Sequence, residues 1–324
     1  MATARRHATG KKPVIGFIGQ GWIGKNYADD FERRGYRTVR YSLEEPYRAN
    51  KDRINECDVV FIAVPTPTTP KGFDASIVAD ALALVGRGKI AVIKSTLLPG
   101  TANRLQRQFP RIIVTFSPEF LTEATAAHDA AHPTRNIVGI PARTPRHRRA
   151  ARRVLALLPE APFSLVCTAT EAELIKYGAN NWFYFKVIFI NLLYDLAERE
   201  GATYDVIREG LAADPRVGKS HLMPVHKSGT LGSDNFRLAA RKPAQGKRGA
   251  GGHCFIKDFA AFRGLYETLV PEDREGRAVL RALEAKNARL LIDSGKDLEL
   301  LVGVYGPGIL RGRRARTGKR NKVR

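Results

Sequence analysis

The sequence predicts an α/β protein in which a doubly wound, Rossmann-type parallel sheet is followed by a helical domain with one long buried helix. Three observations predict this class. Short apolar stretches alternate with helical stretches over the first half of the chain. A G-x-G-x-x-G pattern directly follows the first apolar stretch. From Thr168 onward, one long helical segment runs to a stop at Gly201.

The length of the chain suits two domains better than one, because 324 residues can bury a large core. We expect a dinucleotide-binding sheet domain over 13–167, a helical central domain over 168–300 and a basic tail over 301–324.

Cysteine usage and hydropathy indicate the compartment. Cys57, Cys167 and Cys254 are too few and too scattered for a disulfide framework or a zinc cluster, which points to reducing conditions and no metal site. No apolar run approaches membrane-spanning length, and the basic segment 1–12 leads into a short strand instead of a signal-peptide core. We therefore expect a cytoplasmic protein without a membrane partner.

The formal net charge of +22 invites a nucleic-acid interpretation, but the charge is unevenly placed. Segments 1–12 and 307–324 carry four and eight Lys or Arg and no acid, about half of the excess. The cluster 143–153 is typical of the solvated face of a helix. Because no aromatic-interleaved basic platform is present, we expect no specific nucleic-acid partner, although incidental polyanion binding is compatible with the charge.

The first strand and its following turn predict a dinucleotide site. Val14–Ile18 is followed at once by Gly19-Gln20-Gly21-Trp22-Ile23-Gly24 and a helical stretch to Arg34. In this context the first glycine makes the turn, the second admits pyrophosphate and the third lets helix pack on strand. The helix N-terminus then favours the anion. The expected cofactor-binding residues are Gly19, Gly21, Trp22, Ile23 and Gly24.

The acid expected about twenty residues after the glycines, at the end of the second strand, is missing. The strand 37–41 ends in Ser42, with Glu44 and Glu45 just beyond. Arg40 and Ser42 could suit the 2′-phosphate of NADP, whereas either glutamate could reach the ribose hydroxyl of NAD. NAD is favoured, and NADP stays open.

Further strands are expected at 58–63, 89–94, 112–116, 136–140 and 163–166, with helices such as 74–85 and 101–108 between them. Unusual residues follow three of these strands: Val64-Pro65-Thr66-Pro67, then Ser95-Thr96, then Ser117-Pro118-Glu119-Phe120-Leu121-Thr122-Glu123. Because ligands of open α/β sheets bind outside the carboxyl ends of strands, these segments are expected to line one crevice. The alternative for each is an ordinary turn.

The long helix from Thr168 to Glu200 has Glu171 and Glu173 three residues after Thr168 and Thr170, as capping boxes do. Its middle, 182–193, is apolar around nearly the full circumference, which predicts burial between domains or across a dimer interface. Lys176 and Asn180 share one face and could hold an oxygen-bearing substrate centre. Alternatively, Lys176 is an exposed lysine.

A glycine-rich stretch, Gly249-Ala250-Gly251-Gly252, precedes His253 and Cys254 just before a helix expected over 258–269. A thiol at a helix N-terminus favours the nucleophilic thiolate, and Asp258 falls on the same face four residues later. The alternative is a buried, inert cysteine. A long polar loop over 216–247 leads into this stretch, and another helix is expected over 275–294.

Together, these motifs resemble the UDP-glucose/GDP-mannose 6-dehydrogenase family over about 13–306. The matching segments, in order, are Gly19-x-Gly21-x-x-Gly24, Val64-Pro65-Thr66-Pro67, Lys94-Ser95-Thr96 with Pro99-Gly100-Thr101, Ser117-Pro118-Glu119-Phe120-Leu121, Ala172-Glu173-x-x-Lys176-x-x-x-Asn180 and Gly251-Gly252-His253-Cys254-x-x-Lys257-Asp258.

The resemblance implies an NAD-dependent enzyme that oxidises the C6 alcohol of a nucleotide sugar to the uronic acid, and hence a role in polysaccharide biosynthesis. From the apolar helix we expect a homodimer through 170–200. It implies that Cys254 is the nucleophile that captures the aldehyde and forms a thioester. Lys176 and Asn180 would stabilise oxyanions, and Asp258 and Thr96 would position or activate water. Glu119 would be a further acid, base or water-ordering residue. Further cofactor contacts would be Val64, Pro65, Thr66, Ser95 and Thr96. The implied substrate contacts are Phe120, Leu121, Glu123, Lys176, Asn180 and Gly251.

The C-terminus departs from the family pattern, because members usually continue into a second Rossmann-like domain that binds the nucleotide. This chain resembles a short form without that domain, although Ser233-Asp234-Asn235-Phe236-Arg237 resembles one of its contact motifs. Two alternatives therefore stay open: a non-catalytic dinucleotide-binding scaffold or polyanion-binding relic, and a simple hydroxyacid dehydrogenase. The second would leave Cys254 unexplained.

Overall fold

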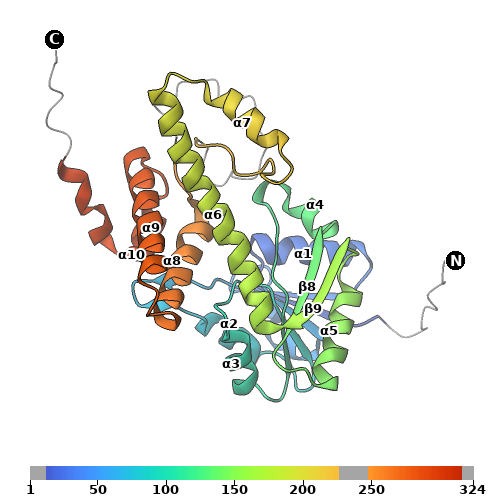
Figure 1. Cartoon of the computed structure of the whole chain (residues 1–324). Coiled ribbons are helices and arrows are strands. Elements are labelled where there is room, and N and C mark those ends of the chain that lie inside the picture. The colour runs from blue at the N-terminus through green and yellow to red at the C-terminus, as the bar shows by residue number, and fades with distance from the viewer. Residues whose placement is uncertain (1–11, 226–246, 316–324) are drawn as a thin grey trace, which may run out of the picture. The chain divides into compact units, whose positions relative to one another are not determined.

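The computed structural model describes residues 12–225 and 247–315, which separate into two compact units (Figure 1). Within these residues, the first unit comprises 12–65, 75–121 and 125–173. The second comprises 66–74, 122–124, 174–225 and 247–315.

The first unit is built on a seven-stranded sheet in the order β2-β1-β3-β6-β7-β8-β9. The strands are β1 (Ile15–Ile18), β2 (Thr38–Tyr41), β3 (Val59–Ile62), β6 (Ile90–Ile93), β7 (Ile113–Phe116), β8 (Arg135–Ile140) and β9 (Phe163–Thr168). The strands from β2 to β7 run parallel, and β8 pairs antiparallel with β7. The predicted doubly wound, mostly parallel sheet is confirmed.

The interior strands β1, β3, β6 and β7 are buried along their whole length, as parallel strands covered by helices on both faces must be. The helices of this unit are α1 (Trp22–Arg33), α2 (Ser76–Ala83), α3 (Thr101–Gln108), α4 (Ala126–Ala131) and α5 (Pro145–Leu157). On one face, Phe17, Phe31 and Phe61 contact one another with ring centroids 5.1 to 5.4 Å apart.

Strand β1 lies between β2 and β3, so the chain changes direction across the sheet at this strand. A crevice forms outside the carboxyl ends of strands at such a switch point. The glycine motif follows β1, and Val64 follows β3, so both segments lie at this position. The sequence did not predict the 3₁₀ helix η1 (Arg48–Glu56) between β2 and β3.

The long helix α6 (Ala169–Arg199) begins and ends as predicted, and Gly201 adopts a left-handed φ of 68° after it. Only one of the two expected capping boxes forms. The Thr168 N–H donates to Glu171 Oε2 at 2.7 Å, and the Glu171 N–H donates to Thr168 Oγ1 at 3.3 Å. The Glu173 carboxylate instead accepts the N–H groups of Gly100 and Ala102, at 2.6 and 2.8 Å, at the N-terminus of α3.

Burial raises the pKa of the Glu173 carboxyl from 4.5 to about 7, although the two backbone donors act to lower it. Between these values the folded chain binds a proton that the unfolded chain has lost. The free energy of unfolding should therefore fall by about 3 kcal/mol as the pH rises through this window. Glu173→Gln should remove that slope. Denaturant unfolding at about pH 5 and about pH 8 measures it, and parallel pH dependences for both proteins would contradict the assignment.

The second unit is mainly helical. Its described elements are α6 from Leu174 onward, α7 (Tyr204–Ala213), α8 (Gly252–Leu269), α9 (Arg274–Ser294), α10 (Leu298–Tyr305), η2 (Glu123–Thr125) in part, η4 (Pro307–Ala315) and the hairpin β4 (Thr68–Thr69) and β5 (Gly72–Phe73). Tyr184 of α6 stacks on Phe259 of α8 with ring centroids 4.0 Å apart. Helices α6 and α8 thereby share one aromatic core.

The expected boundary between central domain and basic tail, at 300/301, falls inside α10. Leu301 and Val304 are buried against Ile256 and Leu291, so this stretch belongs to the core of the second unit. The segment 182–193 is apolar on two faces, and only one of them is buried within the chain. Tyr184, Val187, Ile188 and Ile190 are buried, but Trp182, Phe189 and Leu192 are 62%, 60% and 48% exposed within the chain. The helix therefore has one buried apolar face and one exposed apolar face.

Some expectations fall outside the described residues, namely most of the 216–247 loop with Ser233–Arg237, the segment 1–11 and the basic end 316–324. Within the described chain, every helix is too short or too polar to cross a bilayer.

Candidate active site and cofactor site

The three glycines after β1 occupy three different environments, as the motif predicts. Gly19 has a φ of +89°, and a Cβ there would lie 2.2 Å from Ala63 O. A Cβ on Gly24 would lie 1.9 Å from Gly19 O, so this glycine allows helix and strand to approach. A Cβ on Gly21 would meet no atom of the chain within 4 Å. The open space lies over Gly21, where a pyrophosphate would approach the helix backbone.

Gly21 is also the N-cap of α1, and the first turn of that helix carries no acid and receives no side-chain cap. Its backbone N–H groups therefore remain available to an anion. Trp22 is exposed, and Ile23 is half-buried against the apolar core of the first unit. These residues fit a dinucleotide, which supplies hydride acceptance when bound.

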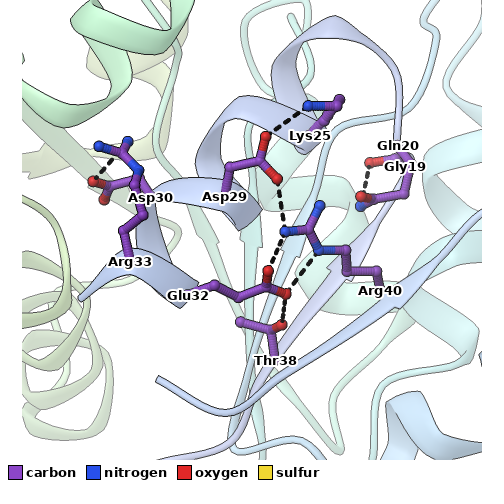
Figure 2. A network of polar contacts seen from close by, with 9 residues as sticks. All are labelled: Gly19, Gln20, Lys25, Asp29, Asp30, Glu32, Arg33, Thr38 and Arg40. Carbon is purple, nitrogen blue, oxygen red and sulfur yellow. Dashed lines mark hydrogen bonds and ion pairs between the residues drawn. The ribbon is translucent and has the colours of Figure 1, made fainter. Parts of the chain in front are cut away.

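Figure 2 shows the contacts of Arg40, the residue of the second strand that could have suited the 2′-phosphate of NADP. Arg40 donates to both carboxylate oxygens of Glu32, at 2.9 and 2.6 Å, and contacts Asp29 at 2.7 Å. Although partial burial alone would raise the pKa of the Glu32 carboxyl, hydrogen bonds from Arg40 and Thr38 lower it. The guanidinium is thus engaged by two acids, and a 2′-phosphate would have to displace them.

Ser42 is likewise engaged, because its hydroxyl donates to Glu44 O at 2.8 Å and accepts the Glu44 N–H at 3.3 Å. Glu44 and Glu45, which follow β2, are both exposed. These observations favour NAD over NADP, because Arg40 is neutralised while Glu44 and Glu45 remain exposed for a ribose hydroxyl.

Three of the predicted crevice segments of the first unit contact one another. The Ser95 hydroxyl donates to Val64 O at 2.7 Å and accepts the Val64 N–H at 2.9 Å. Lys94 donates to the Ser117 hydroxyl at 3.1 Å, and its ammonium lies 4.3 Å from the centroid of the Tyr27 ring. The loops after β3, β6 and β7 therefore converge at the carboxyl edge of the sheet.

The Ser-Pro-Glu-Phe-Leu segment is held at the same edge. Glu119 is 4% exposed and accepts the Leu121 N–H at 2.7 Å. Phe120 lies under the guanidinium of Arg135, 3.7 Å from the ring centroid. Leu121 packs against the core of the first unit. These contacts make the segment an ordered loop, in which Glu119 is a buried carboxyl.

The remaining predicted residues of these loops divide between the units. Pro65 is exposed and Thr96 half-buried in the first unit, whereas Thr66 is buried and belongs to the second unit. The backbone of Glu123 lies in η2, and its side chain lies outside the described part of the chain.

The second unit gathers a polar cluster from α6 and α8. Asp258 is 1% exposed, and each of its oxygens has a donor: Asn180 Nδ2 at 2.6 Å and Lys257 Nζ at 2.5 Å. Lys176 lies one turn before Asn180 on α6 and is 4% exposed. The interpretation of Lys176 as an ordinary exposed lysine is therefore wrong.

Helix α8 begins at Gly252, six residues before the expected 258, so Cys254 lies inside its first turn. Cys254 is exposed, which contradicts the buried alternative. The other two cysteines behave differently, because burial raises the pKa of both the Cys57 and the Cys167 thiols to about 11. Cys254 is thus the accessible thiol of the chain, and Asp258 follows it by one helical turn.

Sequence reasoning did not identify the residues that hold the glycine stretch before Cys254. Asn287 of α9 donates to Ala250 O at 2.9 Å and accepts the Ala250 N–H at 2.7 Å. Gly251, a predicted substrate contact, lies against Asp297, where a Cβ would meet Oδ2 at 2.0 Å. In the sequence, Asn287 is a polar residue on the otherwise apolar face of the helix 275–294. Hydrophobic periodicity does not say what such a residue binds. Among the described residues, no group of His, Cys, Asp and Glu could hold a metal ion.

Comparison with known proteins gives two matches to family models. Residues 37–157 match the NAD binding domain of the UDP-glucose/GDP-mannose dehydrogenase family, and residues 170–233 match the central domain of the same family. The chain is 31% identical to the UDP-glucose 6-dehydrogenase of Rickettsia prowazekii over 299 residues, which cover 86% of this chain and 63% of that protein. It is 29% identical to the Rickettsia typhi protein of that name, with the same coverage. The chain therefore spans less than two thirds of these relatives.

Solved structures agree on the fold. A UDP-glucose dehydrogenase from the archaeon Pyrobaculum islandicum superposes with a TM-score of 0.68 at 25% identity, covering 87% of this chain and 70% of that one. A 3-hydroxyisobutyrate dehydrogenase from Mycobacterium tuberculosis reaches a TM-score of 0.63 at 17% identity and is covered completely. At that identity the second likeness shows the fold alone.

Proposed function

Because the chain belongs to the UDP-glucose/GDP-mannose dehydrogenase family, we propose that it oxidises the C6 alcohol of a nucleotide sugar to the carboxylic acid with NAD. The observation that carries this proposal is the exposed Cys254 in the first turn of α8, on the helix that also presents Asp258 to Asn180. An alcohol dehydrogenase that stops at the aldehyde needs no thiol. Oxidation to the acid benefits from one, because a covalent acyl intermediate retains the aldehyde.

The proposed reaction consists of two oxidation steps and one hydrolysis. NAD held at the glycine motif after β1 would supply the hydride acceptor for the C6 alcohol, and a base takes the hydroxyl proton. The Cys254 thiolate then forms a bond to the aldehyde carbon, and the carbonyl electron pair moves to oxygen to give a thiohemiacetal. Loss of a second hydride from the anion of this thiohemiacetal, for which a second dinucleotide would be the acceptor, leaves a thioester. Water cleaves the C–S bond, which releases the acid and returns the thiol.

The second unit supplies donors for this chemistry. Asn180 and Lys176 are N–H donors on one helical face and suit the stabilisation of oxyanions. Asp258, held on both oxygens, suits the orientation of the hydrolytic water. Glu119 and Thr96 lie in the first unit, and their acid–base and water-positioning roles stay predictions, as do the substrate contacts of Phe120, Leu121, Glu123 and Gly251. The three cysteines form no disulfide, which suits the reducing cytoplasm as its location.

A screen of UDP- and GDP-sugars for NADH formation tests the proposal, with mass spectrometry for an acyl adduct on Cys254. We expect two NADH per sugar consumed and a trapped thioester on the peptide that contains Cys254. Binding of NAD without turnover of any sugar nucleotide would instead support the non-catalytic scaffold. Turnover of small hydroxyacids alone would support the simple dehydrogenase.

We also propose a homodimer through α6. Its exposed apolar face carries Trp182, Phe189, Leu192 and Leu196, spaced by three to seven residues along one side of the helix. Each of these side chains is at least 48% exposed within the chain. A second copy of the same helix offers the matching surface, because a twofold interface pairs one patch with itself.

Phe189→Glu is expected to convert the dimer to a monomer, because it places a charge in the centre of the apolar face. Light scattering coupled to size-exclusion chromatography measures the mass. Val206→Glu is the matched control: Val206 is 68% exposed but lies on α7, so its replacement should leave the mass unchanged. A dimeric Phe189→Glu protein would exclude this face as the interface.

A further inference from the structure

The backbone from Arg248 to Gly252, which leads into the first turn of α8, is bonded at successive positions to the end of α9 and the residues just after it. Arg248 N–H donates to the Ser294 hydroxyl at 3.0 Å, and that hydroxyl donates to Leu290 O of α9 at 2.8 Å. Asn287 binds both backbone groups of Ala250. The segment that precedes the proposed nucleophile therefore has a fixed path.

Lys296 provides the deepest of these contacts. Its side chain is fully buried, and Nζ donates to Gly249 O at 2.8 Å. Burial lowers the pKa of this ammonium from 10.5 to about 8. Burial of an ammonium is costly unless its hydrogen bonds are made, and the bond to Gly249 O offsets part of that cost. At neutral pH it is still largely charged, and its bond to Gly249 O is therefore charge-assisted.

Asp297 contacts the helix itself. Its Oδ2 accepts the N–H of Gly252, the first residue of α8, at 2.7 Å. This bond satisfies one of the N–H groups that a helix N-terminus leaves without an internal partner. The approach is close, because a Cβ on Gly251 would lie 2.0 Å from the same Oδ2 and 2.8 Å from Lys296 Cε. Asp297 thus acts as an N-cap that comes from a distant segment.

The backbone between α9 and α10, which makes these contacts, includes left-handed residues. Asp297 has a φ of 51°, which side-chain-bearing residues rarely adopt, and Gly295 has a φ of 64°. The two left-handed residues flank Lys296, so the chain leaves α9 and enters α10 with one side chain directed into the core and the next at α8. Strain of this kind persists only where the surrounding contacts over-determine it, and it clusters at functional sites.

We propose that Lys296 and Asp297 are positioning residues for Cys254, which hold the glycine stretch and the first turn of α8 in place. Cys254 is the third residue of that helix and so lies in the turn whose first N–H is held by Asp297. The position of its sulfur therefore depends on anchors outside the helix. Lys296 fixes the backbone before the turn, and Asp297 fixes the first N–H of the turn. This inference rests on the proposed role of Cys254 as the nucleophile.

The test compares Asp297→Ala, Asp297→Asn and Lys296→Met in the full chain. Asp293→Ala is the matched control, because Asp293 lies on the same end of α9 but is exposed and pairs with Arg289. Hydrogen exchange followed by mass spectrometry reports the first turn of α8, with α1 as the internal reference. We expect Asp297→Ala and Lys296→Met to exchange about tenfold faster in that turn, without a change in α1.

Kinetics with the nucleotide sugar that the unmodified chain turns over provides the second readout. We expect kcat to fall about 10- to 100-fold in Asp297→Ala, with KM within about threefold, because the nucleophile is misplaced while substrate binding remains. Asp297→Asn should recover most of kcat, since its amide oxygen still accepts the Gly252 N–H.

Three results would overturn the inference: unchanged exchange in the first turn, an unchanged kcat in Asp297→Ala, or a loss in Asp297→Asn equal to that in Asp297→Ala. A lower melting temperature with unchanged exchange in the first turn would assign the pair a merely structural role. The exchange measurement needs no substrate, so it remains decisive even if no sugar nucleotide is turned over and the proposed function fails.

Discussion

Replacement of Cys254 by serine is expected to lower the rate of acid formation about a thousandfold or more. A hydroxyl at this position remains protonated at neutral pH and is a far weaker nucleophile than a thiolate, so neither the thiohemiacetal nor the thioester would accumulate. Because Cys254 is exposed in the first turn of α8, lost packing does not account for a loss of this size. Quantification of the uronic acid by mass spectrometry, beside NADH release, measures the effect.

Cys167→Ser is the matched control for this experiment. Cys167 is half-buried on β9, burial raises the pKa of its thiol to about 11, and it lies in the first unit. Its replacement should leave the yield of acid unchanged. Full turnover in Cys254→Ser would exclude the thioester mechanism, whereas equal losses in both variants would indicate a general effect of removing a thiol.

Gly24→Ala is expected to lower the free energy of unfolding by about 2 to 4 kcal/mol and to weaken NAD binding about a hundredfold. The new methyl group would lie 1.9 Å from Gly19 O, a backbone atom that cannot move aside without displacing the turn after β1. The helix that presents its N-terminus to the cofactor would shift with it. Denaturant unfolding and calorimetric titration with NAD measure the two effects.

Gly21→Ala separates cofactor binding from folding. A methyl group at this position would meet no atom of the chain within 4 Å, so the free energy of unfolding should change by less than about 1 kcal/mol. The methyl group would nevertheless occupy the space over the N-terminus of α1, and NAD affinity should fall about tenfold or more. Unchanged affinity would show that the pyrophosphate does not approach Gly21.

The sheet, the glycine motif and the long helix could be predicted because each follows from the pattern of neighbouring residues. The short apolar stretch Val14–Ile18 followed by Gly19 indicates a strand and its turn without reference to any distant residue. The same holds for Thr168 and Glu171, whose capping box spans a single turn. The switch point follows from strand order, and it places the loops after β1, β3, β6 and β7 at one edge.

Prediction was wrong where partners compete over long sequence distances. Glu173 has the spacing of a capping box with Thr170, yet it caps α3 through Gly100 and Ala102, more than 70 residues earlier. The stretch from Leu301 was expected to be tail, but Leu301 packs against Ile256 in the core. For each residue the local sequence predicts one role, but its buried contacts with distant residues give it a different one.

By itself, the sequence determined the fold class, the dinucleotide motif and the candidate nucleophile, because strand and helix periods and glycine spacing are properties of adjacent residues. Only the tertiary structure decided that Arg40 is neutralised by Asp29 and Glu32 and that Asp258 is held by Asn180 and Lys257. It alone brought Lys296 and Asp297 to the glycines before Cys254. The physical reason is that hydrogen bonds and burial join residues that are close in space, and their separation in the sequence does not predict that proximity.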